Sequence, residues 1–342
     1  MAAKVEKKKG KKTSSRRQTS TSSWGRMLGS RQMKGWLVAN VALIALVLGN
    51  VFAHLPAQKR AQFGAFEATL EKFGLITANF TDSIGLTGRD AKVAYTKSLP
   101  AQTKFPFGQP KVVDTSKAVT DVRILKRKGY WAGWSPVSGH PVYVAYSVPR
   151  RKLLDYPPAR PAFERDIEAL DCPAPEDYTR SGYDRGHMAP NYVIATRYGK
   201  AAQKETFLMS NIVPQSPDLN RGPWRIMEQI VADDLSACAE EVWVITGTVP
   251  KEKKTYINRG KARIPKGFFK IIACHKDGVL RAVGVYMPQE IRSDKHPRYC
   301  LTSIDEIEAM TGLDFFADLP KADQAILESV EPTRFWPTMG IF

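Results

Sequence analysis

The chain has 342 residues, of which 43% are hydrophobic and 25% are charged, and its formal net charge is +17. This length and composition are typical of a globular protein with one large domain or two ordinary ones, which excludes a fully disordered chain. Residues 1–60 hold 13 of the 51 lysines and arginines but only one acidic residue, Glu6. Most of the positive charge therefore lies in this segment, and the net charge is weak evidence that the rest of the chain binds nucleic acid.

The N-terminal 53 residues are expected to place the protein at a membrane. Residues 1–34 are rich in Lys, Arg and Ser and cannot form a core, so they are predicted to be a disordered basic tail. Residues 35–53 form a run of 19 positions without a charged side chain, which is about the length that crosses a bilayer as a helix. The positive-inside rule then predicts a single-pass membrane protein, with residues 1–34 in the cytoplasm and the domain after Ala53 outside it.

Two alternatives explain the same N-terminal segment. It could be a signal peptide that is cleaved near Val51–Ala53, which would release a secreted protein. A basic, Ser-rich and acid-poor start is also typical of a mitochondrial presequence. The run of lysines and the 19-residue apolar span favour an uncleaved anchor.

Residues 54–117 are predicted to form a stalk that leads into the main domain. Apolar residues from Phe63 to Phe73 follow the spacing of one helical face. Residues 76–117 show no clear periodicity, so the sequence does not determine their structure.

From about residue 118 to residue 342 the pattern changes to that of a mixed α+β domain. Short runs rich in β-branched and aromatic residues predict strands at 122–125, 130–134, 141–148, 206–213, 240–247, 267–274 and 279–287. Amphipathic spacing predicts a helix over 224–238. Ser303, placed three residues before Glu306 as in a capping box, predicts a capped helix over 303–312. Such a mixture indicates a mainly antiparallel sheet with helices packed on it.

The stretch that carries the most chemical information is Ser181–Asn191, which contains Asp184, Arg185, Gly186 and His187. The glycine would permit a sharp bend of the backbone. An imidazole titrates near neutral pH and can take a proton from water, and a guanidinium is suited to phosphate oxygens. A phosphodiester hydrolase needs these groups, although a motif this short also fits a polar turn with a structural histidine.

Residues downstream of this motif indicate which family of proteins the chain resembles. The motif is followed, in order, by Ser210-Asn211, Pro214-Gln215, Leu219-Asn220, Trp224 with Glu228, Ile304–Glu308 and Thr311–Pro320. With these residues the chain resembles the DNA/RNA non-specific endonucleases of the ββα-metal, or His-Me finger, superfamily over about residues 118–338. The resemblance implies an α+β, ββα-metal nuclease fold for residues 118–342, with a central mainly antiparallel sheet flanked by helices. The predicted transmembrane helix would precede this domain.

The resemblance also implies the central roles in the site. His187 would be the general base that deprotonates the attacking water, and a metal-ligand role is disfavoured because no second His or Cys stands beside it at ligand spacing. Asn220 would be the direct ligand of one Mg²⁺, with Mn²⁺ as the alternative ion, and Glu228 would hold the water shell of that ion. On one ideal helix these two residues would be about 80° apart, which fits contact through water rather than shared direct ligation. Without the resemblance, Asn220 could be a helix N-cap and Glu228 a solvated helix residue.

Three further side chains complete the predicted site. Asn211 would orient the histidine or the metal shell, and Arg185 would contact phosphate or brace the backbone of the motif. An upstream arginine would stabilise the charged transition state. Arg160 is the first choice for this role, with Arg150 and Arg165 as alternatives.

The implied reaction is metal-dependent hydrolysis of DNA and RNA without sequence preference, because none of these roles reads a base edge. Contacts with the phosphate backbone are expected from four basic residues, Arg197, Lys200, Lys204 and Arg221. The alternative function is a membrane-tethered module for nucleic-acid binding or uptake in which cleavage is secondary. The sequence does not determine the oligomeric state, and a homodimer is one option.

The four cysteines leave two alternatives open. They are Cys172, Cys238, Cys274 and Cys300, and no two of them form a Cys-x-x-Cys pair, which disfavours a zinc site. Outside the cytoplasm they could form up to two disulfides by any of three pairings, and otherwise they would be buried free thiols.

Overall fold

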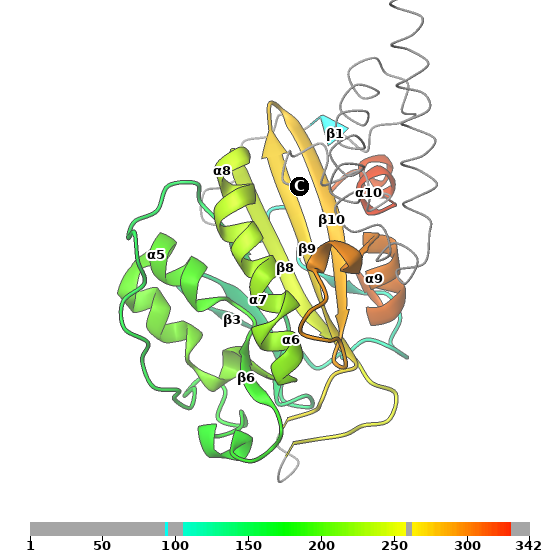
Figure 1. Cartoon of the computed structure of the whole chain (residues 1–342). Coiled ribbons are helices and arrows are strands. Elements are labelled where there is room, and N and C mark those ends of the chain that lie inside the picture. Colours follow the sequence, from blue (N-terminus) through cyan, green and yellow to red (C-terminus); the bar gives the residue numbers. More distant parts are fainter. Residues whose placement is uncertain (1–92, 95–104, 258–261, 330–342) are drawn as a thin grey trace, which may run out of the picture. The chain divides into compact units, whose positions relative to one another are not determined.

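An eight-stranded antiparallel sheet forms the centre of the fold (Figure 1). The structure is a computed structural model that describes residues 93–94, 105–257 and 262–329. Seven strands follow the order β1-β10-β9-β8-β5-β4-β3, and the short β11 pairs with β10. Their bounds are Val93–Ala94 (β1), Arg123–Lys126 (β3), Trp131–Ser135 (β4), His140–Ser147 (β5), Glu241–Val249 (β8), Gly267–Lys276 (β9), Val279–Pro288 (β10) and Leu301–Thr302 (β11). Every neighbouring pair is antiparallel, as the sequence predicts.

This sheet is buried on both faces because its strands contribute to two separate hydrophobic cores. In β5, Val144 and Tyr146 belong to the first core, whereas Tyr143 and Ala145 belong to the second. Successive side chains of a strand point to opposite faces, so each central strand supplies both cores. This explains why β5, β8 and β9 are continuous apolar runs rather than alternating polar and apolar sequences.

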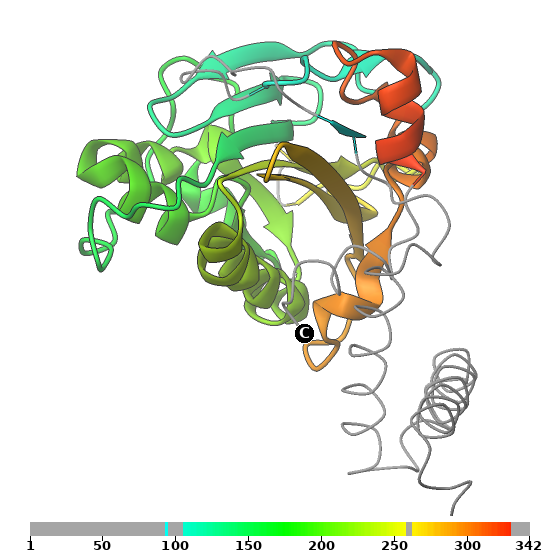
Figure 2. The ribbon, with the colours of Figure 1, turned by 90° about the horizontal axis from the view of Figure 1, so that it is seen from above.

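Helices cover both faces of the sheet, as the view from above shows (Figure 2). The first core is covered by α5 (Asn191–Thr206), α6 (Pro217–Arg221), α7 (Pro223–Gln229), the π-helical segment η4 (Ile230–Leu235) and α8 (Ser236–Cys238). The second core is covered by α9 (Ile304–Thr311) and α10 (Lys321–Glu328). The domain is therefore a sheet enclosed between two helical layers.

Short elements complete the described part of the chain. Two small antiparallel sheets pair β6 (Asp184–His187) with β7 (Ile212–Gln215) and β2 (Lys111–Val112) with β12 (Leu313–Asp314). Single 3₁₀ turns lie at Pro175–Tyr178 (η2), Met209–Asn211 (η3) and Pro297–Cys300 (η6). Phe105 and Phe107 are buried in the second core, so the start of this described segment packs against the sheet.

Most of the predicted elements are confirmed with small shifts at their ends. Six of the seven predicted strands correspond to β3, β4, β5, β8, β9 and β10, and the predicted helix over 224–238 corresponds to the run from α7 to α8. Ser303 caps α9, because its Oγ accepts a hydrogen bond from the Glu306 amide at 3.1 Å. The Glu306 carboxylate instead accepts a hydrogen bond from Thr302 Oγ1, so only half of the predicted capping box is present.

The predicted strand over 206–213 is wrong, because Thr206 ends α5 and the strand begins only at Ile212. The sequence did not indicate α5, which is bent at Gly199, with φ 84°, and is rich in β-branched residues in its first half. Tertiary contacts stabilise it instead, since Val193, Ile194 and Ala202 are buried in the first core.

The N-terminal predictions concern a part of the chain that the structure does not describe. The basic tail 1–34, the apolar segment 35–53 and most of the stalk 54–117 lie outside the described residues. Within the described ranges, no helix combines the length and apolarity that a membrane span requires. All four cysteines do lie in the described part, and all four are free thiols. Burial raises the pKa of Cys274 to about 12, which makes this thiol unreactive.

Two glycines with almost the same backbone angle allow the packing around α9 to be tested. Gly312 ends α9 with φ 69°, and a Cβ there would lie 2.4 Å from the Asp114 carbonyl oxygen. Gly278, in the turn between β9 and β10, has φ 71° and no atom within 4 Å of such a Cβ. We expect Gly278→Ala to lower the free energy of unfolding by about 1 kcal/mol, from backbone strain alone. Gly312→Ala should lower it by about 2–4 kcal/mol, because a steric clash is added. Urea unfolding measures both, and equal losses would contradict the close approach at Gly312.

Candidate active site

The predicted motif forms one strand of a small hairpin beside the main sheet. β6 pairs with β7 so that Gly186 lies opposite Val213 and His187 lies opposite Ile212. α5 occupies the connection between the two strands, and α6 follows β7 directly. The local unit is therefore strand, strand and helix, which agrees with the ββα arrangement that the resemblance implies.

The predicted sharp bend at Gly186 is wrong, because this residue is extended within β6. The glycine is needed for space instead. A Cβ on Gly186 would lie 2.1 Å from Oε1 of Gln215, whose side chain crosses the strand at this point. Both polar atoms of the Gln215 amide are buried and have no hydrogen-bond partner among the described residues.

The His187 imidazole is half-buried in an aromatic setting. Its ring centroid lies 5.4 Å from that of Phe163 and 4.8 Å from that of Phe207. Burial and the positive charge of Arg160 lower the pKa of His187 to about 3, against the opposite effect of a hydrogen bond with the Arg185 backbone. The ring is therefore neutral at pH 7, and its buried Nε2 has no hydrogen-bond partner within the described ranges. An unpartnered ring nitrogen on a neutral imidazole is the feature that a general base requires.

Asn211 holds the backbone that follows His187. It is fully buried, its Oδ1 accepts a hydrogen bond from the Ala189 amide at 2.9 Å, and its Nδ2 donates to the Ala189 carbonyl at 3.0 Å. Nδ2 also donates to the Thr206 carbonyl at 2.9 Å, which ties the end of α5 to its beginning. These hydrogen bonds fix the turn between β6 and α5, so the effect of Asn211 on the imidazole is transmitted through the backbone.

Asn220 lies on α6 with its amide oriented by Asp184 of β6. Asn220 Nδ2 donates to Asp184 Oδ2 at 2.9 Å, which directs Oδ1 away from that carboxylate. Burial opposes ionisation of Asp184, but hydrogen bonds from Arg221 and Asn220 outweigh it and lower the pKa of this carboxyl group. The N-cap alternative for Asn220 is excluded, because Asn220 lies inside α6, which Ser216 caps, and Gly222 occupies the N-cap position of α7. A neutral amide oxygen held in this way is a hard donor that suits Mg²⁺.

Glu228 lies on α7, and α7 is not continuous with α6. The chain breaks between them at Gly222, with φ −99° and ψ −116°, so the angle expected from one ideal helix does not apply. A side chain at Gly222 would meet the Asp218 carbonyl at 2.5 Å and the Ser293 carbonyl at 2.7 Å, so close packing requires a glycine here.

The Glu228 carboxylate is only 22% exposed and faces a fully buried lysine of β9. Its Oε1 lies 3.8 Å from Lys270 Nζ, which in turn lies 3.7 Å from the ring centroid of Trp224. Burial raises the pKa of Glu228 and lowers the pKa of Lys270. Neither Glu228 Oε1 nor Lys270 Nζ has a hydrogen-bond partner in the described part of the chain. The alternative of a solvated helix glutamate is thus excluded, and the carboxylate retains capacity to bind a hydrated ion.

The arginines of the predicted site occupy different positions. Arg160 lies with its guanidinium carbon 5.4 Å from the Phe207 ring centroid, and its charge acts on His187. Arg185 donates to the Pro175 carbonyl from Nη2 at 2.6 Å, so it braces the motif. Arg150 and Arg165 are exposed, and neither is among the charges that shift the pKa of His187.

The loop that carries Arg160 and Phe163 is fastened to the chain before β7. The Glu164 amide donates to the Phe207 carbonyl at 3.1 Å, and the Met209 amide donates to the Glu164 carbonyl at 2.9 Å. Further along the loop, the buried Asp166 accepts hydrogen bonds from Arg127 and Ser210. The prediction from sequence did not include Phe163, Phe207 or Lys270. Of these three residues, only Lys270 had a recognisable signal in the sequence, because it is a lysine inside the apolar run of β9.

The predicted backbone contacts need one correction. Arg197 is only 6% exposed and donates to Thr196 Oγ1 at 2.8 Å and to the Ala232 carbonyl, so it stabilises the first helical layer and is not accessible to a substrate. Arg221 is exposed but forms two hydrogen bonds with Asp184. Lys200 and Lys204 are exposed on α5.

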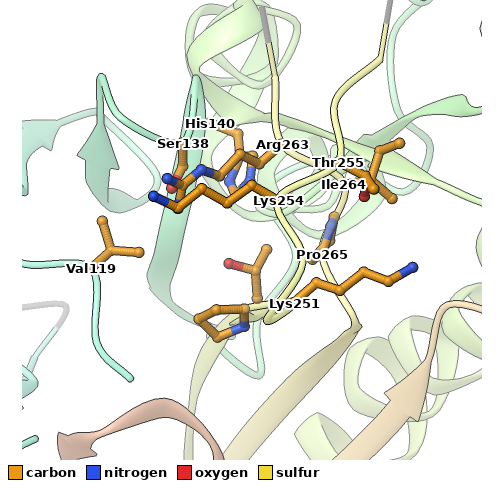
Figure 3. A pocket seen from close by; sticks show the side chains of 11 residues that line it. Val119, Ser138, His140, Lys251, Lys254, Thr255, Arg263, Ile264 and Pro265 are labelled. Atoms are coloured by element: carbon orange, nitrogen blue, oxygen red, sulfur yellow. The ribbon is translucent and has the colours of Figure 1, made fainter. Parts of the chain in front are cut away.

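A basic groove of about 970 Å³ lies at the end of β8 and reaches α9 at Ala309 and Met310. Six basic residues line it, Lys117, Lys251, Lys253, Lys254, Arg263 and Lys266, together with the acidic Asp121, Glu252 and Glu290. Figure 3 shows Lys251, Lys254 and Arg263 in a smaller pocket that shares these residues with the groove. Gln289, next to Glu290, accepts a hydrogen bond from the Ser216 amide at 2.8 Å and donates to the Pro214 carbonyl at 2.9 Å. One edge of the groove is therefore joined to the β7–α6 connection.

Comparison with known proteins is consistent with this geometry. Residues 114–322 match the model of the family described as DNA/RNA non-specific endonuclease. A nuclease of a Nostoc species is 32% identical over 165 residues, which is 45% of this chain and 58% of that protein. Human mitochondrial nuclease EXOG is 32% identical over 161 residues, or 43% of each protein, and Serratia marcescens nuclease is 31% identical over 176 residues, or 48% of this chain and 63% of that protein.

A solved structure supports the same fold. The crystal structure of the EndoG/EndoGI complex has a TM-score of 0.55 at 22% identity and covers 66% of this chain and 96% of that one. At this identity the likeness concerns the fold alone. The chain spans about half the length of the relatives that it matches, from 44% to 58% for the first three.

The lowered pKa of His187 predicts how acid affects the stability of the site. The folded-state pKa of about 3 lies below the ordinary histidine pKa of 6.5, so the unfolded chain binds more protons between these values. The contribution of His187 is therefore fully present above about pH 6.5 and is lost as the pH falls, by up to about 2 kcal/mol at pH 5. We expect His187→Ala to lose less stability than the parent between pH 7.5 and pH 5 in EDTA. Urea unfolding at the two pH values checks this, because any general destabilisation cancels in the difference. Equal losses in both proteins would show that the ring is not held neutral.

Proposed function

The chain belongs to the DNA/RNA non-specific endonuclease family, and from this premise we propose that it hydrolyses phosphodiester bonds of DNA and RNA without sequence preference. The observation that carries the proposal is the neutral His187 with its unpartnered Nε2, on the strand whose Asp184 orients Asn220. A base, an oxygen donor for a metal ion and a nearby arginine are thereby placed on one strand–strand–helix unit and the loop packed on it. None of these groups reads a base edge, which supports cleavage independent of sequence.

The chain's own residues would do the following. Nε2 of His187 takes the proton from the attacking water, and the aromatic rings around it keep the imidazole neutral and oriented. Asn211 and Arg185 hold the backbone on either side of the histidine. Arg160 lies close enough to act on the charge of His187, so we assign to it the stabilisation of negative charge that develops on the phosphate.

The donor set fits a hard divalent cation. Asn220 Oδ1 would bind it directly, and the Glu228 oxygen that does not face Lys270 would hold its water shell. Such an ion supplies charge neutralisation and a polarised water to phosphodiester hydrolysis. We propose Mg²⁺, with Mn²⁺ as the alternative, because both accept amide and carboxylate oxygen.

Substitution of the histidine tests the mechanism. We expect His187→Ala to lower the rate of plasmid and RNA cleavage by about 10²–10⁴-fold, because the general base is removed, and EDTA to abolish cleavage by the parent. The matched control is His275→Ala, since His275 lies at the far end of β9 and is paired with Glu240. Nicking assays with and without Mg²⁺ measure both variants.

Two results of that assay would contradict the proposal in different ways. A His187→Ala protein that cuts as fast as the parent would show that another group is the base. A parent protein that binds DNA tightly but never cuts it with any divalent ion would favour a nucleic-acid-binding or uptake module.

The basic groove supports a second element of the proposal, contact with the substrate backbone. Lys251 and Lys254 are exposed and line a groove whose edge is joined through Gln289 to the β7–α6 connection. Lysines at such a position would neutralise phosphates and release counterions.

Charge reversal in the groove measures this contribution. In the His187→Ala background we expect the double variant Lys251→Glu/Lys254→Glu to bind DNA about 10-fold or more weakly at low salt. The slope of log K against log salt should also fall by about 1–2, because up to two phosphate contacts are lost. The matched control is Lys276→Glu, at the last residue of β9, which should bind DNA like its His187→Ala parent. An unchanged slope in the double variant would place the substrate elsewhere.

For the cellular location we propose that residues 35–53 anchor the protein with the nuclease domain outside the cytoplasm. The uncharged 19-residue span behind a basic tail supports this, and cleavage of a signal peptide or mitochondrial presequence is the alternative. In intact cells, with any outer membrane permeabilised, added protease should degrade the nuclease domain. N-terminal sequencing of the mature protein should find residues 1–53 still attached. A protected domain would contradict this orientation.

A further inference from the structure

A cluster of three carboxylates joins α9 to α10 on the face of the sheet that does not carry the candidate active site. Asp305 and Glu308 lie one turn apart on α9, and Glu328 is the last residue of α10. One ligand oxygen from each of the three lies within 4.8 Å of the other two. Both helices pack on the second core, through Ile304, Ile307 and Leu327.

The carboxylate of Glu328 is buried in acidic surroundings. It is only 6% exposed, and its Oε1 is buried without a hydrogen-bond partner among the described residues. Its surroundings are acidic, because Glu308, Asp314 and Asp305 all raise its pKa in addition to the effect of burial. An unpartnered buried carboxylate oxygen costs free energy unless a proton or a cation compensates it.

The other members of the cluster have partners that do not supply this compensation. Glu308 Oε1 accepts a hydrogen bond from the Phe315 amide at 2.7 Å, which leaves its second oxygen for another partner. Lys321, whose charge has only a minor opposing effect on the pKa of Glu328, is 80% exposed and lies 3.7 Å from Asp314. Neither contact neutralises Glu328.

The spacing of the oxygens fits a shared ion. Two oxygens that bind one Ca²⁺ at about 2.3–2.6 Å each can be no more than about 5 Å apart, and the three ligand atoms satisfy this limit. Carboxylates from two different helices also give the flexible all-oxygen environment that Ca²⁺ accepts more readily than Mg²⁺. Water can complete the coordination on the exposed side, where Asp305 lies.

We propose that Asp305, Glu308 and Glu328 form a structural cation site of the calcium class that fastens α10 to α9. This site differs in place and purpose from the one at Asn220, because it lies on the opposite face of the sheet and contains no group of the cleavage machinery. Its expected affinity is modest, with a Kd on the order of 10⁻⁴ M, since only three protein carboxylates contribute.

Calorimetry on full-length protein tests the proposal. Asn220→Ala is used as the parent, so that the predicted ion at the active site does not contribute heat. After removal of metal with EDTA and exchange into chelator-free buffer, titration of this parent with CaCl₂ at pH 7.5 should show binding at a single site. Glu328→Gln in the same background should weaken that binding at least 10-fold. Glu241→Gln, which removes one exposed carboxylate at the start of β8, is the matched control and should bind Ca²⁺ like its parent.

Thermal unfolding gives an independent readout, because the shift of Tm on addition of Ca²⁺ is measured without a heat of binding. Millimolar Ca²⁺ should raise the Tm of the Asn220→Ala parent by roughly 5 °C. In this background Glu328→Gln should lose the response and, in EDTA, should melt above its parent, because one of three mutually repelling carboxylates is gone. Glu328→Gln alone, with Asn220 intact, should keep normal Mg²⁺-dependent cleavage, so failure of this proposal and failure of the nuclease assignment are distinguishable.

Two outcomes would overturn the site. One is the absence of Ca²⁺ binding by the Asn220→Ala parent, which would mean that the carboxylates share protons instead of a cation. The other is equal Ca²⁺ affinity in the parent and in the Glu328→Gln protein, which would place the ion elsewhere.

Discussion

The contact between Lys270 and Glu228 constrains much of the candidate site. Lys270 stands in the middle of a strand whose two faces are both buried, so its ammonium group must be compensated within the first core. The Trp224 ring and the Glu228 carboxylate provide this compensation, and both belong to α7. An unpaired ammonium group at such a depth would cost several kcal/mol, so α7 can dock only where these two groups reach it. The position of α7 over the sheet then determines where the chain before it can lie.

The chain before α7 links the metal-binding helix to the strand of the base. Gly222 permits the tight packing that separates α6 from α7, and α6 contacts β6 through the hydrogen bond from Asn220 to Asp184. On the other side, the loop around Phe163 is fastened to the residues before β7 and encloses the imidazole. The chemistry assigned to His187 thus depends on packing and on backbone hydrogen bonds far more than on the local sequence Asp184–His187.

The two helical layers compensate buried carboxylates in different ways. On the first face, Glu228 Oε1 lies 3.8 Å from the ammonium group of a buried lysine, and neither atom has a hydrogen-bond partner in the described chain. On the second face, the neighbours that raise the pKa of Glu328 are other acids, and Lys321 is paired with Asp314. Since both sites lack a full set of donors, a cation is a natural partner for each. The physical role differs, because one ion would face a substrate and the other would only join two helices.

By itself, the sequence determined which chemical groups belong to the candidate site and where the main strands lie along the chain. Apolar runs such as 267–274 and the His187, Asn220 and Glu228 series carry this information locally, because strand pattern and residue type need no knowledge of the rest of the chain. The tertiary structure alone decided which atoms are left unpartnered and which charges are accessible. It buried Arg197, gave Gly186 its role through Gln215, and placed Phe163 and Phe207 around the base. These features depend on contacts between residues far apart in the chain, and no local pattern specifies how such segments pack.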